Sequence, residues 1–216
     1  MTILALEFSS PQRSVASARG NSVLSEAVET GGRNTAAFGM IEKVLAAAKI
    51  EREEIETIVI GLGPGSYTGI RAAIAVAQGW QLARKTKLIG INSVEAMVAE
   101  AQAQKFFGRV NVAIDAQRNE FYLAIYEIAE NEWKEIEPLK IVTLAELQSR
   151  VQVNKIVSGS EIFKCFPNVQ VILPRATRLA EIAAGRNDFC AGEKLEPIYL
   201  RETNFVKSSL RPSAAS

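Results

Sequence analysis

The stretch Thr57-Ile-Val-Ile-Gly-Leu-Gly-Pro-Gly-Ser-Tyr-Thr-Gly-Ile-Arg71 contains an apolar strand, a glycine-rich loop and the first turn of a helix. The β-branched run at residues 57–62 predicts a buried strand, and the helical pattern continues over residues 67–84. Free backbone N–H groups and the helix dipole favour an anion at such a loop. Alternatively, the glycines only permit a sharp turn and close packing of the helix. The loop residues are Gly63, Gly65, Ser66, Thr68 and Gly69.

The spacing of this loop does not match the common phosphate-binding motifs. No pair of its glycines has the GxxxxGK spacing of a P-loop, and the next lysine is Lys85. Thr68 stands where the third glycine of GxGxxG belongs. Spacing alone therefore favours the turn-and-packing interpretation of the loop over phosphate binding.

The chain before this stretch predicts an antiparallel meander followed by a helix. Ile3–Glu7, Ser14–Ala18 and Val23–Glu29 alternate like strands and are separated by turn residues. From Asn34 to Lys49 the apolar period changes to that of a helix with an unusually wide apolar arc. After the glycine loop and its helix, a strand at 88–91 and a helix at 93–104 complete a first lobe, residues 1–107.

The second half of the chain repeats this order. Three strands are expected at 110–115, 120–128 and 133–142, then a helix capped by Thr143, short strands at 156–158 and 169–173, and a helix from 176 to about 185. Three strands followed by alternating helices and strands, occurring twice, predict a duplicated α/β fold. The second lobe is expected to be truncated and to span 108–207, with a disordered tail at 208–216.

Composition limits the chemistry of the chain. Its 216 residues are 48% hydrophobic and 23% charged, and the formal net charge is +1, so a protein that grips nucleic acid alone through many phosphate contacts is disfavoured. The chain contains no histidine, which excludes serine triads, Cys-His dyads and HExxH zinc sites within it. With two cysteines, no signal peptide pattern and no span of about 20 apolar residues, we expect a cytoplasmic protein without a membrane segment.

Several motifs resemble one family. Gly63-Pro-Gly-Ser-Tyr-Thr-Gly-Ile-Arg71, the start Ile3-Leu-Ala-Leu-Glu-Phe-Ser-Ser10, Val112-Ala-Ile-Asp-Ala-Gln-Arg-Asn-Glu-Phe-Tyr122 and Glu196-Pro-Ile-Tyr-Leu-Arg201 occur in the order seen in the TsaB family of tRNA threonylcarbamoyladenosine biosynthesis proteins. Together they cover nearly the whole chain. The resemblance implies the duplicated fold of actin-like and sugar-kinase-like ATPases, with two lobes that each begin with a three-stranded antiparallel meander.

The resemblance also implies a partner subunit rather than an enzyme. TsaB proteins resemble their catalytic paralogue TsaD, whose metal is held by a pair of histidines, and this chain has none. The implied function is a scaffold that supports TsaD, with the ATPase subunit TsaE, while tRNA is modified by the complex. Family members often keep a single histidine near the first helix, where this chain has Asn34. The sequence does not explain that replacement.

Four polar residues are candidates for nucleotide binding. Glu7 stands where actin-like ATPases usually have an aspartate that positions metal-bound water, with Ser9 and Ser10 in the hairpin that follows, and Asp115 is placed similarly in the second lobe. Weak ATP or ADP binding with Mg²⁺, between the lobes or between subunits, is one interpretation. The other is that Glu7 is a structural or solvated residue and that Asp115 is a turn or inter-lobe hydrogen-bonding residue.

The first two helices are the expected partner surface, because their apolar residues extend around most of the circumference. TsaB proteins pair these helices with the equivalent pair of TsaD, and a homodimer through the same helices is the alternative for the free chain. A small ATPase or kinase acting alone is the competing function, and a peptidase is a third, for which no aspartyl pair or lysine-activated serine is visible. The expected interface residues are Ala36, Met40, Val44, Ala73 and Val76.

Overall fold

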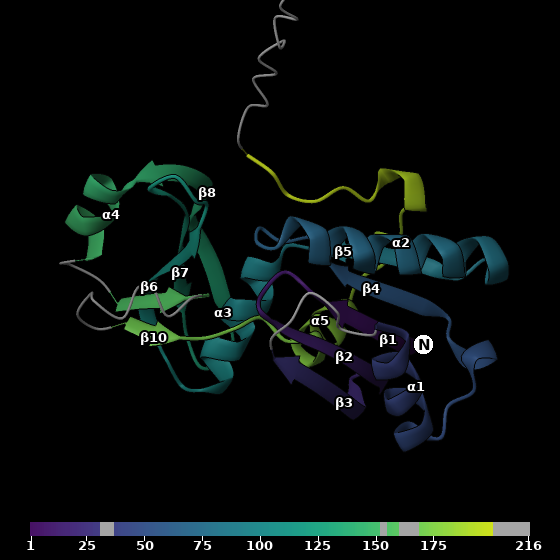
Figure 1. The fold of residues 1–216 in the computed structure, drawn as a ribbon. Coiled ribbons are helices and arrows are strands. Elements are labelled where there is room, and N and C mark those ends of the chain that lie inside the picture. The colour runs from purple at the N-terminus through teal and green to yellow at the C-terminus, as the bar shows by residue number, and fades with distance from the viewer. Residues whose placement is uncertain (31–36, 152–154, 160–168, 201–216) are drawn as a thin grey trace, which may run out of the picture.

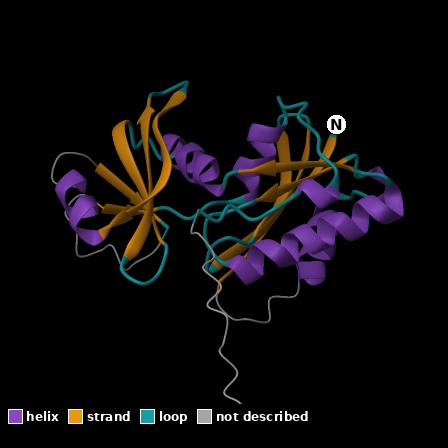
Figure 2. Ribbon diagram, turned by 90° about the horizontal axis from the view of Figure 1, so that it is seen from above, coloured by secondary structure: helices purple, strands orange, loops and turns teal. Residues whose placement is uncertain are grey.

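A computed structural model describes residues 1–30, 37–151, 155–159 and 169–200 (Figure 1). Within these residues the chain forms two five-stranded mixed sheets with helices packed on their faces. Figure 2 shows the two sheets side by side, each in its own lobe. Asn34, Ala36, Cys165 and the expected tail at 208–216 lie outside the described residues.

The first sheet has the strand order β3-β2-β1-β4-β5. Strands β1, β2 and β3 pair antiparallel, and β4 and β5 add to β1 in parallel. This arrangement confirms the predicted antiparallel meander and shows that the two strands after it are parallel to β1. The bounds are β1 Thr2–Glu7, β2 Gln12–Arg19, β3 Ser22–Thr30, β4 Thr57–Gly61 and β5 Lys87–Ile91.

Two helices, α1 (Ala37–Ala48) and α2 (Tyr67–Arg84), cover one face of this sheet. The core on that face joins strand residues such as Leu4, Leu6 and Ile60 to the helices. A short 3₁₀ turn, η1 (Arg52–Glu54), occupies the charged bend before β4. The bounds of α2 match the sequence prediction for residues 67–84.

The second sheet has the order β10-β9-β6-β7-β8 and repeats the topology of the first. Strands β6, β7 and β8 form an antiparallel meander, and β9 and β10 add in parallel. Helix α4 (Leu144–Val151) packs on one face, and Glu146 donates its backbone N–H to the Thr143 hydroxyl 3.3 Å away, as the capping pattern predicts. The bounds are β6 Gly108–Asp115, β7 Glu120–Ile128, β8 Trp133–Thr143, β9 Lys155–Ser158 and β10 Val169–Val171. The predicted duplicated α/β fold, in which each sheet contains a three-stranded antiparallel meander, is therefore confirmed.

Helix α3 (Ser93–Ala103) lies between the lobes and contributes to both cores. Val94, Met97 and Val98 pack against the second sheet, whereas Ala96 faces the first sheet. Because residues of this one helix belong to both hydrophobic cores, α3 connects the two lobes through side-chain packing.

The last described helix, α5 (Ala176–Ala183), returns to the first sheet, which corrects the expectation that residues 108–207 form the second lobe. Leu179, Ala180 and Ala183 are fully buried against β1, β2 and β4. The Ala176 N–H also donates to the Ser14 hydroxyl of β2, 2.8 Å away. Sequence periodicity identifies the apolar face of a helix but not the sheet that receives it.

The segment 188–200, which includes the 3₁₀ turn η3 (Gly192–Lys194), continues along the first lobe beside α2 (Figure 1). The Cys190 N–H donates to the Leu88 carbonyl, and the Ile198 N–H donates to the Leu62 carbonyl, 2.9 and 2.8 Å away. Gln78 of α2 donates to the Gly192 carbonyl over 2.9 Å. None of the helices in the described part of the chain is long and apolar enough to span a bilayer.

Candidate functional site

The glycine loop after β4 is packed against the hairpin between β1 and β2. The Ser66 N–H donates to the Ser9 carbonyl over 2.6 Å, and the Ser66 hydroxyl caps α2 by accepting from the Gly69 N–H. The Gly63 N–H donates to the Ser93 hydroxyl, 3.0 Å away at the start of α3. The loop thus joins β1, α2 and α3 at one point.

The glycines of this loop are required by close contact and by backbone conformation. A Cβ at Gly65 would lie 2.1 Å from the Ser9 carbonyl oxygen, and one at Gly69 would lie 2.1 Å from the Phe8 carbonyl oxygen. Gly63 has φ of +84° and Gly65 has φ of +149°, a region that L side chains rarely adopt. The geometry supports the interpretation that these glycines allow a sharp turn and a close helix.

Glu7 is fully buried at the end of β1, and both carboxylate oxygens have protein donors. The Ser9 N–H donates to Oε1 over 2.7 Å, and the Ser93 hydroxyl donates to Oε2 over 2.8 Å. A Cβ at Gly61 would lie 2.0 Å from Oε2. Burial raises the pKa of this carboxyl above its ordinary value, and the hydrogen bonds from Ser9 and Ser93 only partly oppose that effect.

The contacts of Glu7 can be compared with the expectation that this residue helps to bind a nucleotide with Mg²⁺. A carboxylate that positions metal-bound water must face solvent or ligand. Glu7 instead faces Ser9, Ser93 and Gly61, and it does not line the cavity between the lobes. In the described residues, no three carboxylate or cysteine side chains gather closely enough to hold a metal ion. The environment of Glu7 fits the structural interpretation, in which its carboxylate connects β1 to α3.

Several candidate residues do meet in one cavity of about 620 Å³ between the lobes. Ser9 and Ser10 from the first hairpin, the glycine loop, and Asp115 at the end of β6 all line it. The Asp115 carboxylate accepts the Gln117 N–H over 2.7 Å and so also shapes the turn after β6, as its turn interpretation expects. The volume lies within the range typical of small-molecule sites, about 300–1,000 Å³.

Most of the expected interface residues belong to the core of the first lobe. Met40 and Val44 are 1% exposed and Ala73 is 0% exposed, all within the core between α1, α2 and the sheet. Val76 is half-buried against that core. Met40, Val44 and Ala73 are therefore not available to a partner, and a charge at Met40 would be placed in the core of the lobe.

The faces of α1 and α2 that point away from the core are built mainly from other residues. Phe38 is 64% exposed on α1, and Leu82 is 87% exposed on α2. Between these large side chains the exposed positions include small residues, which let the backbone of another helix approach closely. We call this surface the α1–α2 face; its exposed apolar and small residues are Phe38, Gly39, Ala46, Ala47, Ala75, Gly79 and Leu82.

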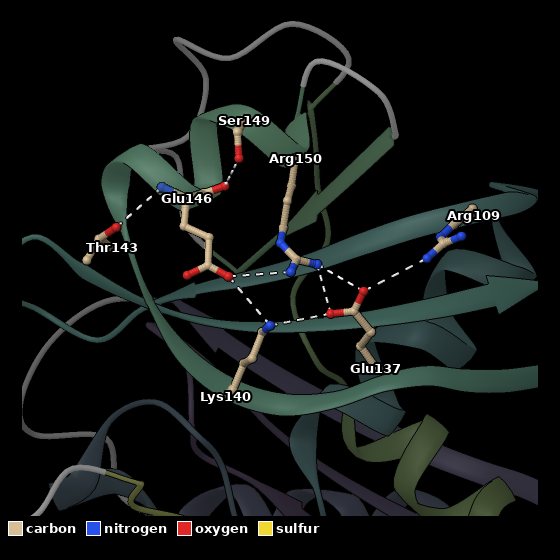
Figure 3. Close-up of polar contacts among 7 residues, drawn as sticks. All are labelled: Arg109, Glu137, Lys140, Thr143, Glu146, Ser149 and Arg150. Atoms are coloured by element: carbon tan, nitrogen blue, oxygen red, sulfur yellow. Dashed lines mark hydrogen bonds and ion pairs between the residues drawn. The ribbon is translucent and has the colours of Figure 1, made fainter.

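A separate polar cluster lies on the second lobe, where α4 packs beside β8 (Figure 3). Glu137 accepts two hydrogen bonds from Arg150, at 3.0 and 2.8 Å, and pairs with Lys140 over 3.4 Å. The hydrogen bonds from Arg150 hold the pKa of Glu137 below its ordinary value. Arg109 and Glu146 complete this network. It lies on the surface, and its ion pairs connect α4 to β8.

Comparison with known proteins places this geometry in a family. The model of the family described as TsaD, tRNA N6-adenosine threonylcarbamoyltransferase, matches residues 34–195. The chain belongs to the TsaD family.

Individual relatives within the TsaD family confirm the resemblance to TsaB. The tRNA threonylcarbamoyladenosine biosynthesis protein TsaB of Escherichia coli K12 is 29% identical over 182 residues, covering 75% of this chain and 78% of that protein. The TsaB of Haemophilus influenzae is 26% identical over 227 residues, covering 93% and 94%. A crystal structure of an uncharacterized protein with similarity to peptidase YEAZ, from Pseudomonas aeruginosa, has a TM-score of 0.78 at 25% identity and covers 93% of this chain and 99% of that one.

Sequence reasoning missed two residues of the site. Ser93 is bonded to Glu7, 86 positions earlier in the chain, and no local pattern marks it beyond its place at the start of a helix. Arg13 lines the cavity from β2. It follows the first hairpin directly, and that position was the only signal that could have identified it.

Proposed function

We propose that this chain is a non-catalytic subunit of the assembly that forms threonylcarbamoyladenosine in tRNA. In this assembly it pairs with TsaD through the α1–α2 face, is completed by the ATPase subunit TsaE, and acts in the cytoplasm. tRNA is bound only by the assembled complex. The observation that carries the proposal is an exposed face of small and apolar helix residues on a chain of the TsaD family.

The residue types of the chain favour the role of a non-catalytic subunit. Transfer of an acyl group needs an activated nucleophile or a bound metal, and the commonest general base is histidine. The chain has no histidine, and its best candidate carboxylate, Glu7, is enclosed by Ser9, Ser93 and Gly61. The alternative of a small ATPase acting alone would need a carboxylate placed to hold Mg²⁺, and Glu7 does not line the cavity between the lobes.

The pairing argument rests on shape and on shared ancestry. An exposed leucine and phenylalanine beside small residues allow two helices to approach closely and to bury the large side chains at the rim of the contact. A partner of the same family has the same fold and therefore presents an equivalent helix pair. Pairing of like faces would also allow the free chain to form a homodimer, in which a second copy takes the place of TsaD.

The test is co-purification of TsaD from the same organism with the tagged chain, with the native mass of each species measured. We expect a stoichiometric complex, and Leu82→Asp should weaken it by at least about 2 kcal/mol, the cost of a typical hot spot. Leu24→Asp is the matched control, because Leu24 is an exposed leucine on β3, 43% exposed, outside the α1–α2 face. The proposal fails if TsaD is not recovered, and the assigned face is wrong if both variants bind TsaD equally.

A further inference from the structure

The ion pairs of the arginines are distributed unevenly over the chain. Most arginines of the described ranges pair with a carboxylate. The paired ones include Arg19, Arg52 and Arg84, whose side chains are 53%, 57% and 47% exposed. Exposure alone therefore does not leave an arginine without a carboxylate in this protein. Among the residues that the structure describes, the arginines outside any such ion pair are Arg13, Arg71 and Arg118.

These three arginines lie at or beside the cavity between the lobes. Arg13 is half-buried and lines it. Arg71 is exposed on α2, about one turn after Thr68, which lines the cavity. Arg118 is exposed in the turn after β6, directly after Gln117, which also lines the cavity. Two exposed cations therefore lie near the rim of the cavity, one on each lobe.

Two tyrosines lie beside Arg71 on this rim. Tyr67 is 54% exposed and Tyr199 is 49% exposed, and their ring centroids lie 6.4 Å apart. The rings are tilted by 57°, so neither ring covers the face of the other. The Arg71 guanidinium lies over the Tyr67 ring, 5.4 Å from its centroid. Figure 1 shows the segment 188–200 ending beside α2.

The two tyrosines are not needed to hold the segment 188–200 on the first lobe. Backbone hydrogen bonds already attach this segment, from Cys190 to Leu88 and from Ile198 to Leu62. Leu195 also belongs to the core of the lobe. Large aromatic side chains that stay half-exposed on a segment already fixed by its backbone are available to a partner.

The chemistry of this rim favours an unpaired nucleic-acid strand over the other partners. Bases stack on the faces of tyrosine rings and guanidinium groups, and the phosphates between the bases are neutralised by arginines. A small phosphate would use the charges and leave the rings exposed. An acidic side chain of a protein would occupy one arginine, whereas the two exposed arginines lie on different lobes. Asp115 is the one carboxylate among the residues that line the cavity, so positive charge prevails at the rim.

We infer that an unpaired segment of tRNA contacts this rim when the chain is assembled with TsaD. We call the contact surface the rim patch; its residues are Tyr67, Arg71, Arg118 and Tyr199. The tyrosines stack bases, and the arginines neutralise phosphates. The inference rests on the proposed function, which brings tRNA to the complex, and it assigns part of the RNA-binding surface to this chain.

The test measures RNA binding by the complex of TsaD with the unchanged chain and with each variant. Fluorescence anisotropy of a labelled, unmodified tRNA transcript gives the affinity, and native mass verifies that each complex has formed. We expect Tyr67→Ala and Tyr199→Ala each to weaken RNA binding about fivefold or more, because one stacked base is lost. Tyr67→Phe is the matched control, because it keeps the ring. An unpaired oligonucleotide should compete with the transcript better than a duplex of the same length, whose bases are already stacked.

The salt dependence of binding tests the arginines separately from the fold. Arg71→Ala and Arg118→Ala should each reduce the slope of log affinity against log salt concentration by about 0.7, the share of one phosphate on a single strand. Arg71→Lys should keep the slope and lose only part of the affinity. Arg19→Ala is the matched control, because Arg19 is exposed, pairs with Glu54 and does not line the cavity.

Two results overturn the inference while leaving the proposed function intact. One is equal RNA affinity and equal salt slope for the unchanged complex and for the complexes with rim-patch variants. The other is loss of TsaD from the complex with Tyr67→Ala or Arg71→Ala, which would make the rim patch a protein contact. If native mass shows no complex even with the unchanged chain, the proposed function fails, and this inference fails with it.

Discussion

Replacing Gly69 by alanine tests the close contact between α2 and the first hairpin. Gly69 is the third residue of α2, and its added Cβ would lie 2.1 Å from the Phe8 carbonyl oxygen and 3.2 Å from the carbonyl carbon. Non-bonded carbon and oxygen atoms need well over 3 Å, so helix and hairpin would have to separate by about 1 Å or more. Backbone atoms limit the contact on the hairpin side, so no side-chain rotation relieves it.

The size of the effect follows from two opposing contributions. Overpacking of a rigid contact costs about 1–3 kcal/mol. Alanine in place of glycine within a helix stabilises by at most about 1 kcal/mol. Gly79→Ala is the matched control in the same helix, because nothing lies within 4 Å of its added Cβ. The two substitutions should therefore have opposite signs: Gly69→Ala destabilises the lobe, and Gly79→Ala stabilises it by up to about 1 kcal/mol.

Urea unfolding of the isolated chain, followed by circular dichroism, measures both free energies. We expect the Gly69→Ala midpoint below that of the unchanged chain and the Gly79→Ala midpoint above it, with the same urea dependence. Equal stabilisation by both substitutions would refute the reasoning, because it would mean that the contact with Phe8 imposes no constraint on the loop.

Three further predictions concern the core, the buried carboxyl and the junction of α3 with α5. Met40→Asp should unfold the first lobe, seen as loss of the cooperative thermal transition, because Met40 is 1% exposed. Because the pKa of Glu7 is raised, the folded state binds the proton of this carboxyl more tightly than the unfolded state does, and the free energy of unfolding falls as pH rises above about 4.5. Glu7→Gln should therefore gain stability relative to the unchanged chain between pH 4 and 7, as measured by urea titrations. Arg178→Ala should cost about 1–3 kcal/mol of unfolding free energy, because Glu100, 8% exposed, loses a hydrogen bond of 2.8 Å.

Local patterns predicted most elements of the fold. The bounds of α2 and β7 agree with the sequence prediction, because a capped helix and an alternating strand are specified by their own residues. The destination of α5 could not be predicted in this way. Its apolar face fits either sheet, and only contacts between residues about 160 positions apart, such as Ser14 with Ala176, decide between them.

The site was predicted less well than the fold, for a related reason. An apolar helix residue such as Met40 can face a core or a partner, and the sequence pattern is the same in both cases. The exposed positions are partly alanine and glycine, which carry little hydrophobic signal of their own. Likewise, the partners of Glu7 could not be identified from the strand that carries it, because Ser93 belongs to a distant helix.

The return of α5 to the first lobe makes the second lobe an insertion within the first, with a consequence for synthesis on the ribosome. The face of the first sheet that includes Ile3, Val59 and Ile89 is covered by α5. That helix is translated about 90 residues after β5, which corresponds to roughly 5–20 s at typical elongation rates. During this interval the nascent sheet has one bare apolar face, so a chain halted before Ala176 should be captured by chaperones or aggregate, whereas the completed chain covers that face itself.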